Sequence, residues 1–288
     1  MIRIGISGWT YEGWRGTFYP SDLAHSKELP FASRQVSSIE INGTFYSLQR
    51  PESYARWYEM TPDDFQFSVK ANRYITHIDR LKNPEIPMAN FFASGVFKLQ
   101  EKLGPILWQF PPSFRFDPER VEQFFKLLPR DQKEGVKLAK KHQLNKDRVY
   151  LKAEDYPMRH AMEIRHESFL NPWFIELLNK YNVALVFADS AGLYPYMEDV
   201  TSEFIYIRLH GESELYVSGY DEDSLNMWKE RIIYWQKGKE PDDKLTLSEI
   251  VPESHPRDIY IYFDNDAKVR APIDARRLSD KLSPFLNS

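Results

Sequence analysis

The 288-residue sequence contains no cysteine. A disulfide scaffold, a thiolate zinc site, an iron–sulfur cluster and a cysteine nucleophile are therefore excluded together. The chain also lacks a hydrophobic run of membrane-spanning length. Its N-terminus, MIRIGISGWT, leads straight into a strand without the charged and apolar regions of a secretory signal. We therefore expect a cytoplasmic protein that does not engage a membrane.

Several familiar ligand-binding signatures are absent too. The sequence has no GxGxxG motif, no Walker-type phosphate loop and no HExxH motif, so the binding modes that depend on them are excluded. The formal net charge of −4 disfavours a generally basic nucleic-acid surface. A local basic cleft is still compatible with that net charge.

Eight short runs rich in β-branched and aromatic residues are present, and each is predicted to form a buried strand. Most of them end in a polar residue. The predicted strands are Arg3–Gly8, Ser37–Gly43, Phe65–Ala71, Pro105–Pro111, His160–Arg165, Ala184–Asp189, Phe204–Gly211 and Asp258–Asn265.

Helical patterns follow most of these strands, and this alternation predicts a parallel α/β sheet. Eight repeats favour closure into a single (βα)₈ TIM-type barrel domain spanning residues 1–288. Two irregularities are expected: a charged, exposed insertion near 129–152, and a missing or shortened helix over Ser190–Glu203 after the sixth strand. The predicted helices are Pro51–Met60, Pro84–Leu103, one starting at Asp117, one from Asn171 to near Tyr181, Asp221–Trp235 and Ala271–Leu286.

Charged and polar side chains recur near the C-terminal ends of the predicted strands, where barrels carry their functional sites. Alternate residues of a strand point to the same face, so Glu163 and Arg165 share a face, as do Arg208 and His210. Charges inside apolar strands are costly unless partnered. We therefore predict that one pocket is built from Glu40, Lys70, Gln109, Glu163, Arg165, Asp189, Arg208, His210 and Asp264.

The cations of this set indicate an anionic ligand. Lys70, Arg165 and Arg208 would hold it by charge-assisted hydrogen bonds, with Glu163 or Glu40 as general acid or base and His210 as the partner proton carrier. The candidate catalytic residues are Glu40, Glu163, Arg165, Arg208 and His210. The candidate ligand-binding residues are Trp9, Asn42, Tyr46, Lys70, His77, Gln109, His166, Asp189, Tyr220, Asp264 and Asn265.

Structural roles compete with these assignments. Glu163 and Arg165 could form a purely structural ion pair, Asn42 precedes a glycine in a turn-like pair, and Asp264 could only cap the last helix. No cofactor is predicted, because the three cations would repel a divalent metal in the same pocket. A metal site built from separate strands is the less favoured alternative.

Three functions are compatible with this pocket. The first is an enzyme, a hydrolase or isomerase, acting on a phosphorylated or nucleic-acid-derived anion by acid/base chemistry. Under it, Arg208→Ala should abolish ligand binding without lowering the melting temperature. The second is a non-catalytic ligand-binding or accessory protein, whose protein partners are unknown. The third is a glycoside hydrolase that uses Glu40 and Glu163 as a carboxylate pair.

Seven ordered segments resemble the motifs of the YecE-like family, domain of unknown function 72. They span nearly the whole chain: Gly5–Pro20, Glu40–Leu48, Phe67–His77, Leu107–Phe114, Glu163–Phe169, Tyr206–Gly211 and Tyr262–Asp266. The resemblance implies a TIM-type barrel and no established biochemical role. The sequence departs from the usual pattern at Phe169, where tryptophan is common, and at Lys268–Arg270, where a glycine often occurs.

Overall fold

Eight parallel strands form a closed barrel in the computed structural model, which describes residues 1–285. Each strand pairs with its neighbour in the sequence, and β1 closes the barrel on β8 through pairs such as Ile4 with Ile261. The predicted TIM-type barrel is confirmed. The strands are β1 Ile2–Ser7, β2 Ser38–Ile41, β3 Gln66–Lys70, β4 Leu103–Gln109, β5 His160–Glu163, β6 Ala184–Asp189, β7 Phe204–Leu209 and β8 Asp258–Phe263.

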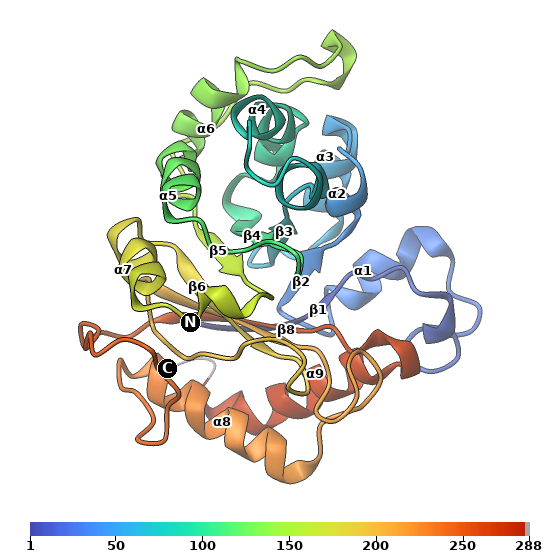
Figure 1. Ribbon diagram of the computed structural model, residues 1–288. Helices are drawn as coiled ribbons and strands as arrows, with labels where there is room; N and C mark the ends of the chain where they lie inside the picture. The colour runs from blue at the N-terminus through green and yellow to red at the C-terminus, as the bar shows by residue number, and fades with distance from the viewer. Residues whose placement is uncertain (286–288) are drawn as a thin grey trace.

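Helices surround the strands (Figure 1). The Asp117 and Asn171 side chains cap the helices that begin at Pro118 and Pro172, as the Asp-Pro and Asn-Pro pairs predict. None of the helices within residues 1–285 combines the length and apolar character needed to cross a bilayer. The α-helices are α1 Glu28–Ala32, α2 Gly43–Tyr46, α3 Pro51–Met60, α4 Glu85–Ala93, α5 Pro118–Leu127, α6 Gln132–Ala139, α7 Pro172–Lys180, α8 Glu222–Gln236 and α9 Arg270–Leu282.

The helix predicted over Pro84–Leu103 is divided in the structure. Helix α4 ends at Ala93, and Gly95 takes a φ of 113°, a left-handed conformation that favours glycine. A Cβ at Gly95 would lie 2.5 Å from the Cα of Pro51. The chain therefore turns closely past the start of α3 and resumes as a separate 3₁₀ segment, η4 (Val96–Lys102).

The charged insertion is helical, as predicted, but only partly exposed. Its helix α6 packs against α4, and Gln132, Gly135 and Ala139 are buried. Gly135 lies against the ring of Phe97, so close that a Cβ would be 2.4 Å from it. The insertion is therefore anchored to the barrel by one buried helix face and charged on the other.

No helix connects β6 to β7 in the described part of the chain, which confirms the predicted irregularity. Hydrogen bonds fix this connection to the loop before β8 instead. Asp199 accepts from the backbone N–H groups of Leu247 and Ser248, and the buried carboxylate of Glu198 pairs with Arg231 at 2.9 Å. Polar contacts thus replace the packing that a helix would supply.

Tyrosine and serine side chains fill much of the barrel interior. Ser38 and Tyr262 share a hydrogen bond of 2.7 Å, and Ser68 and Tyr206 share one of 2.6 Å. All four residues are completely buried. A buried hydroxyl is costly unless it is bonded, so these pairs fix the side chains below the C-terminal end of the barrel.

Gly5 is required for this interior to pack. A Cβ there would lie 2.0 Å from the backbone oxygen of Ser38 on β2 and 3.3 Å from the ring of Tyr262. We expect Gly5→Ala to lower the free energy of unfolding by about 1–3 kcal/mol, the usual cost of overpacking. Gly13→Ala is the matched control because nothing lies within 4 Å of its added Cβ. Equal midpoints for the two variants in urea unfolding would contradict this interpretation.

Candidate functional site

The guanidinium of Arg208, on β7, lies among three carboxylates at the C-terminal end of the barrel. Its Nη1 donates to Glu163 Oε2 at 2.6 Å, and its Nη2 donates to Glu40 Oε1 at 2.9 Å and to Asp264 Oδ2 at 2.8 Å. Its Nε also donates to Glu40 Oε2 at 3.1 Å. Arg208 and Glu40 have no exposed surface, and Glu163 is 1% exposed. The residues therefore form a buried charge network in which three carboxylates share one guanidinium.

Glu40 and Asp264 have further hydrogen-bond partners besides Arg208. Ser7 Oγ donates to Glu40 Oε1 at 2.9 Å, and the Tyr206 hydroxyl donates to Glu40 Oε2 at 2.6 Å. His210 Nδ1 lies 3.0 Å from Asp264 Oδ2. Although burial alone would raise the pKa of Asp264, Arg208 and His210 hold it at about 2. Asp264 is therefore an ionised carboxylate with Arg208 and His210 as its hydrogen-bond partners.

Glu163 is held by Gln109, at the end of β4, and by Arg165, two residues past the end of its own strand. Gln109 Nε2 donates to Glu163 Oε1 at 2.9 Å, and Arg165 Nε donates to the same oxygen at 2.8 Å. Burial opposes ionisation, but Arg208 and Arg165 keep the pKa of Glu163 well below its usual range. Arg165 also donates to the hydroxyl of Tyr216 at 3.1 Å, so its guanidinium is oriented from both sides.

A cavity of about 660 Å³ opens above this network, and we call it the central cavity. Its volume lies in the range of small-ligand sites, about 300–1,000 Å³. Its walls come from the loops and strand ends at the C-terminal face of the barrel. The lining residues are Tyr11, Asn42, Phe45, Tyr46, Lys70, Arg73, His77, Gln109, Arg165, Tyr216, Asp264 and Asp266.

Lys70, at the end of β3, faces the central cavity with its ammonium group unbonded. Within residues 1–285 its Nζ has no hydrogen-bond or ion-pair partner, and it lies 4.4 Å from the centre of the Phe45 ring. Burial and the nearby charge of Arg208 lower the pKa of Lys70 to about 8. Burial, Lys70 and Arg165 lower the pKa of His77 to about 4, so His77 is neutral at pH 7.

Asp266 supplies a second carboxyl group beside Asp264. Burial and the charge of Asp264 raise the pKa of Asp266 to about 8, so it carries a proton at pH 7. The hydroxyl of Tyr11 donates its single proton to the carbonyl of Ser7 at 2.6 Å.

A smaller cavity of about 280 Å³ adjoins the central cavity, and we call it the aromatic cavity. The two share Tyr11, Asn42 and Tyr46 as lining residues, and the aromatic cavity adds Trp9 and Trp57, whose rings meet edge to face at 5.5 Å. Asn42 Oδ1 is buried and has no hydrogen-bond partner within the described residues. This unbonded acceptor lies at the junction of the two cavities but is covered by its neighbours.

The structure divides the predicted site residues into three groups. Eight face one of the two cavities: Trp9, Asn42, Tyr46, Lys70, His77, Gln109, Arg165 and Asp264. Four lie beneath the central cavity in the buried network: Glu40, Glu163, Arg208 and His210. Four are absent from the lining of both cavities: His166, Asp189, Tyr220 and Asn265.

The residues of the last group form hydrogen bonds with other residues of the protein, away from the two cavities. Asp189 is a correction to the predicted pocket, because Ala188 pairs with the inward-pointing Arg208 and Asp189 therefore points outward. It accepts from the hydroxyl of the buried Tyr220 at 3.0 Å. The ring of His166 accepts from the backbone N–H of Ser168. Asn265 donates to Asp274 at 3.1 Å and to the carbonyl of Ser218 at 2.9 Å.

Five residues that line the central cavity were not predicted: Tyr11, Phe45, Arg73, Tyr216 and Asp266. All lie on loops or short helices beyond the strand ends, where strand parity gives no information. All of them except Tyr216 belong to segments that already stood out by motif: Tyr11, Phe45, Arg73 and Asp266. Tyr216 lies six residues past His210 in an irregular loop, and no sequence signal marks it.

The buried carboxylates also bear on the metal alternative. Within the described residues no group of three or more histidine, aspartate or glutamate side chains has the arrangement of a metal site. Glu40, Glu163 and Asp264 converge instead on the guanidinium of Arg208.

Comparison with known families identifies the chain. The family model described as "Protein of unknown function DUF72" matches residues 3–286. The chain belongs to the DUF72 family. Among curated relatives, this DUF72 chain is 26% identical to the UPF0759 protein YunF of Bacillus subtilis over 98% of its own length and 95% of the relative. It is 30% identical to the UPF0759 protein YecE of Escherichia coli K12, over 40% of this chain and 39% of that protein.

Solved structures of DUF72 proteins have the same fold. A DUF72 family protein of Thermotoga maritima superposes with a TM-score of 0.74 at 26% identity, covering 98% of this chain and 99% of that one. A DUF72 family protein of Enterococcus faecalis superposes with a TM-score of 0.71 at 17% identity, covering 98% and 96%. The names of these relatives give no ligand or reaction.

Proposed function

We propose that the central cavity binds a small anionic ligand, phosphorylated or nucleic-acid-derived. The observation that carries this proposal is the Lys70 ammonium, which faces the cavity without a hydrogen-bond or ion-pair partner in the described residues. The Lys70 side chain is partly exposed to this cavity, and an anionic ligand would give its ammonium group the charged hydrogen-bond partner that it lacks.

The remaining charges of the cavity lining support this ligand class. Arg73 and Arg165 line the cavity with Lys70, so three cations face a lining with two acids. Asp264 is ionised but bonded to Arg208, and Asp266 is protonated at pH 7. The charge that a ligand meets is therefore positive.

The paired acids favour acid/base chemistry on that ligand. A protonated Asp266 beside an ionised Asp264 supplies a proton donor and an acceptor in one cavity, the usual sign of divided acid and base roles. Glu40, Glu163 and His210 were the sequence-based candidates for these roles. Because they lie beneath the lining, we propose that they position Asp264 and Arg165 instead.

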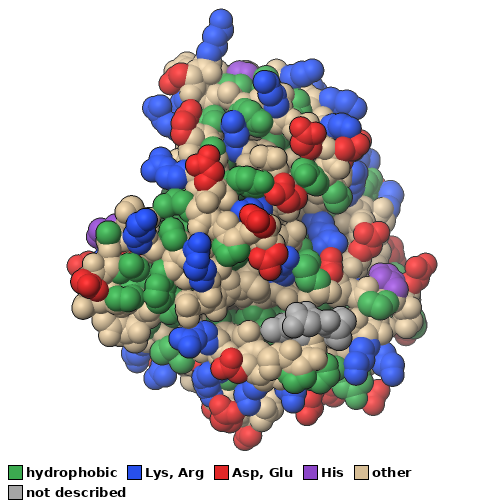
Figure 2. Space-filling view, turned by 180° about the vertical axis from the view of Figure 1, so that it is seen from behind, with side chains coloured by type: hydrophobic (Ala, Val, Ile, Leu, Met, Phe, Trp, Pro, Cys, Tyr) green, Lys and Arg blue, Asp and Glu red, His purple; other side chains and the backbone are tan. Residues whose placement is uncertain are grey.

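A specific observation favours a ligand that also carries a ring. The aromatic cavity joins the central cavity at Tyr46, whose side chain is 70% exposed, and Trp9 forms part of its wall. Such rings stack on bases and sugars. Acidic and basic side chains are interspersed over the face shown in Figure 2, which favours a small ligand in the cavity over a polymer spread on a basic surface.

The other two functions are less well supported. Glu40 and Glu163 both bond to Arg208 and are buried, so a carboxylate-pair glycoside hydrolase would lack acids that reach a sugar. A non-catalytic binding protein would use the same cations but would return its ligand unchanged. Mass spectrometry of a bound nucleoside phosphate, recovered before and after incubation, distinguishes a binder from an enzyme.

Anion binding is tested by calorimetric titration with inorganic phosphate at pH 7. We expect Lys70→Gln to weaken phosphate binding at least about tenfold, because the unpaired cation is lost. Lys98→Gln is the matched control: Lys98 also lies over an aromatic ring, 4.2 Å from the centre of Tyr150, but outside the cavity. Equal affinity of Lys70→Gln and the native protein would overturn the proposal.

A further inference from the structure

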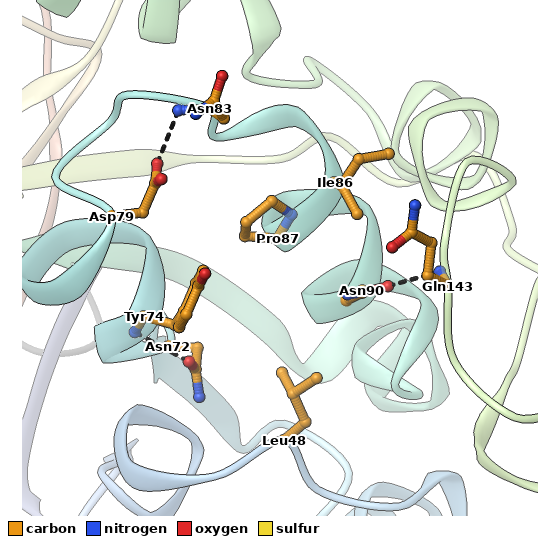
Figure 3. Close-up of a pocket in the computed structure, with 9 residues that line it drawn as sticks. All are labelled: Leu48, Asn72, Tyr74, Asp79, Asn83, Ile86, Pro87, Asn90 and Gln143. Carbon is orange, nitrogen blue, oxygen red and sulfur yellow. Dashed lines mark hydrogen bonds between the residues drawn. The ribbon is translucent and has the colours of Figure 1, made fainter.

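A third cavity, of about 460 Å³, has a chemistry unlike that of the central cavity (Figure 3). We call it the amide cavity, because four of the nine residues that line it have carboxamide side chains. None of the nine is a lysine or arginine, and one is acidic. The lining residues are Leu48, Asn72, Tyr74, Asp79, Asn83, Ile86, Pro87, Asn90 and Gln143.

The short π-helical segment η3 (Tyr74–Ile78) separates the amide cavity from the central cavity. Tyr74 lines the amide cavity, whereas Arg73, just before this segment, and His77, within it, line the central one. Segments of π-helix are rare and occur frequently at functional sites. The irregular turn therefore lets one stretch of chain serve two cavities.

Several polar groups of the amide cavity are available to a ligand. The Asn83 and Gln143 side chains have no hydrogen-bond partner within residues 1–285, since only their backbone N–H groups are bonded, to Asp79 and Asn90. In Figure 3, Asp79 and Asn83 lie on one side of Pro87 and Asn90 and Gln143 on the other. These groups come from the segment after β3, from α4 and from the insertion after α6.

An apolar surface accompanies these groups. The side chain of Tyr74 is 51% exposed, and Leu48, Ile86 and Pro87 complete the lining. Carboxamides both donate and accept hydrogen bonds, as sugar hydroxyls do, and a tyrosine ring offers an apolar face beside a polar hydroxyl. With one acidic residue and no lysine or arginine in its lining, the cavity favours a neutral ligand over an anion.

We infer that the amide cavity is a binding site for a neutral saccharide, separate from the anion-binding central cavity. The sugar hydroxyls would bond to Asn83, Asn90 and Gln143, and an apolar face of the sugar ring would pack on Tyr74. The inference does not depend on the proposed function, because the two cavities have different lining residues.

Saturation-transfer NMR with a panel of neutral gluco-, manno- and N-acetylglucosamine oligosaccharides tests the inference. We expect at least one sugar to bind the native protein, and Tyr74→Ala and Gln143→Ala each to weaken its binding at least tenfold. Tyr234→Ala is the matched control, because Tyr234 is a comparably exposed tyrosine (46%) on α8. It should bind the sugar as the native protein does.

Lys70→Gln separates the two proposals, since it should impair phosphate binding and leave saccharide binding unchanged. Binding of no sugar in the panel would overturn the inference. So would undiminished binding by Tyr74→Ala, or loss of sugar binding in Lys70→Gln, which would place the sugar in the central cavity. Displacement of the sugar by an uncharged peptide that binds more tightly would also overturn it.

Discussion

Arg208→Ala is expected to lower the free energy of unfolding by about 3–5 kcal/mol, the usual effect of removing one partner from a buried ion-pair network. The loss would leave Glu40 and Glu163 without their main counter-charge in a site closed to water. At about 2–4 °C for each kcal/mol in a domain of this size, the melting temperature should fall by roughly 10 °C. The sequence-based expectation of an unchanged melting temperature is therefore revised.

The pH dependence of this variant identifies the cause of its instability. Without Arg208 the buried carboxylates should take up protons more readily, and protonation would remove their unpaired charge. The stability deficit relative to the native protein should therefore shrink as the pH is lowered from 8 to 5. Arg120→Ala is the control, since Arg120 is a 38% exposed arginine paired with Asp117, the N-cap residue of its helix, and its loss should cost less than about 1 kcal/mol. A melting temperature within 2 °C of the native value for Arg208→Ala would contradict the structural role.

Phosphate affinity is expected to fall about tenfold between pH 7 and pH 9, although phosphate itself becomes more negatively charged over this interval. The pKa of Lys70 is lowered to about 8, so its charged fraction drops from about 90% to about 10% across this interval. The pKa of Asp266 is raised to about 8, so Asp266 gains a negative charge over the same range. Both changes oppose an anion, and they therefore add in the same direction.

Two variants separate these contributions. Lys70→Arg keeps its charge at every pH of the titration and should remove most of the Lys70 part of the decline. Asp266→Asn cannot ionise and should remove the part of the decline that arises from Asp266. Calorimetric titration with phosphate at pH 6, 7, 8 and 9 measures both effects. A decline of equal size in the native protein and in the double variant would show that neither group is responsible.

The sequence predicted the barrel well because its eight strands and most of its helices carry strong local signals. Pro118 and Pro172, each behind a capping residue, mark helix starts by local chemistry alone. The helix break at Gly95 was missed because it depends on the close approach of Pro51, which lies 44 positions earlier in the chain. Asp189 was misplaced because its position at a strand end does not show which face it occupies.

By itself the sequence determined the fold class, the missing helix after β6 and the concentration of charge at the C-terminal ends of the strands. These follow from hydrophobic periodicity and turn chemistry, which are local. Only the tertiary structure decided the depth of each charge. The stagger of neighbouring strands in a barrel sets the height at which their side chains meet, so Arg208 and Glu40 lie beneath the cavity while Lys70 faces it. Barrel closure also brings Tyr11 beside Asp266 across the whole length of the chain, and no local pattern encodes that contact.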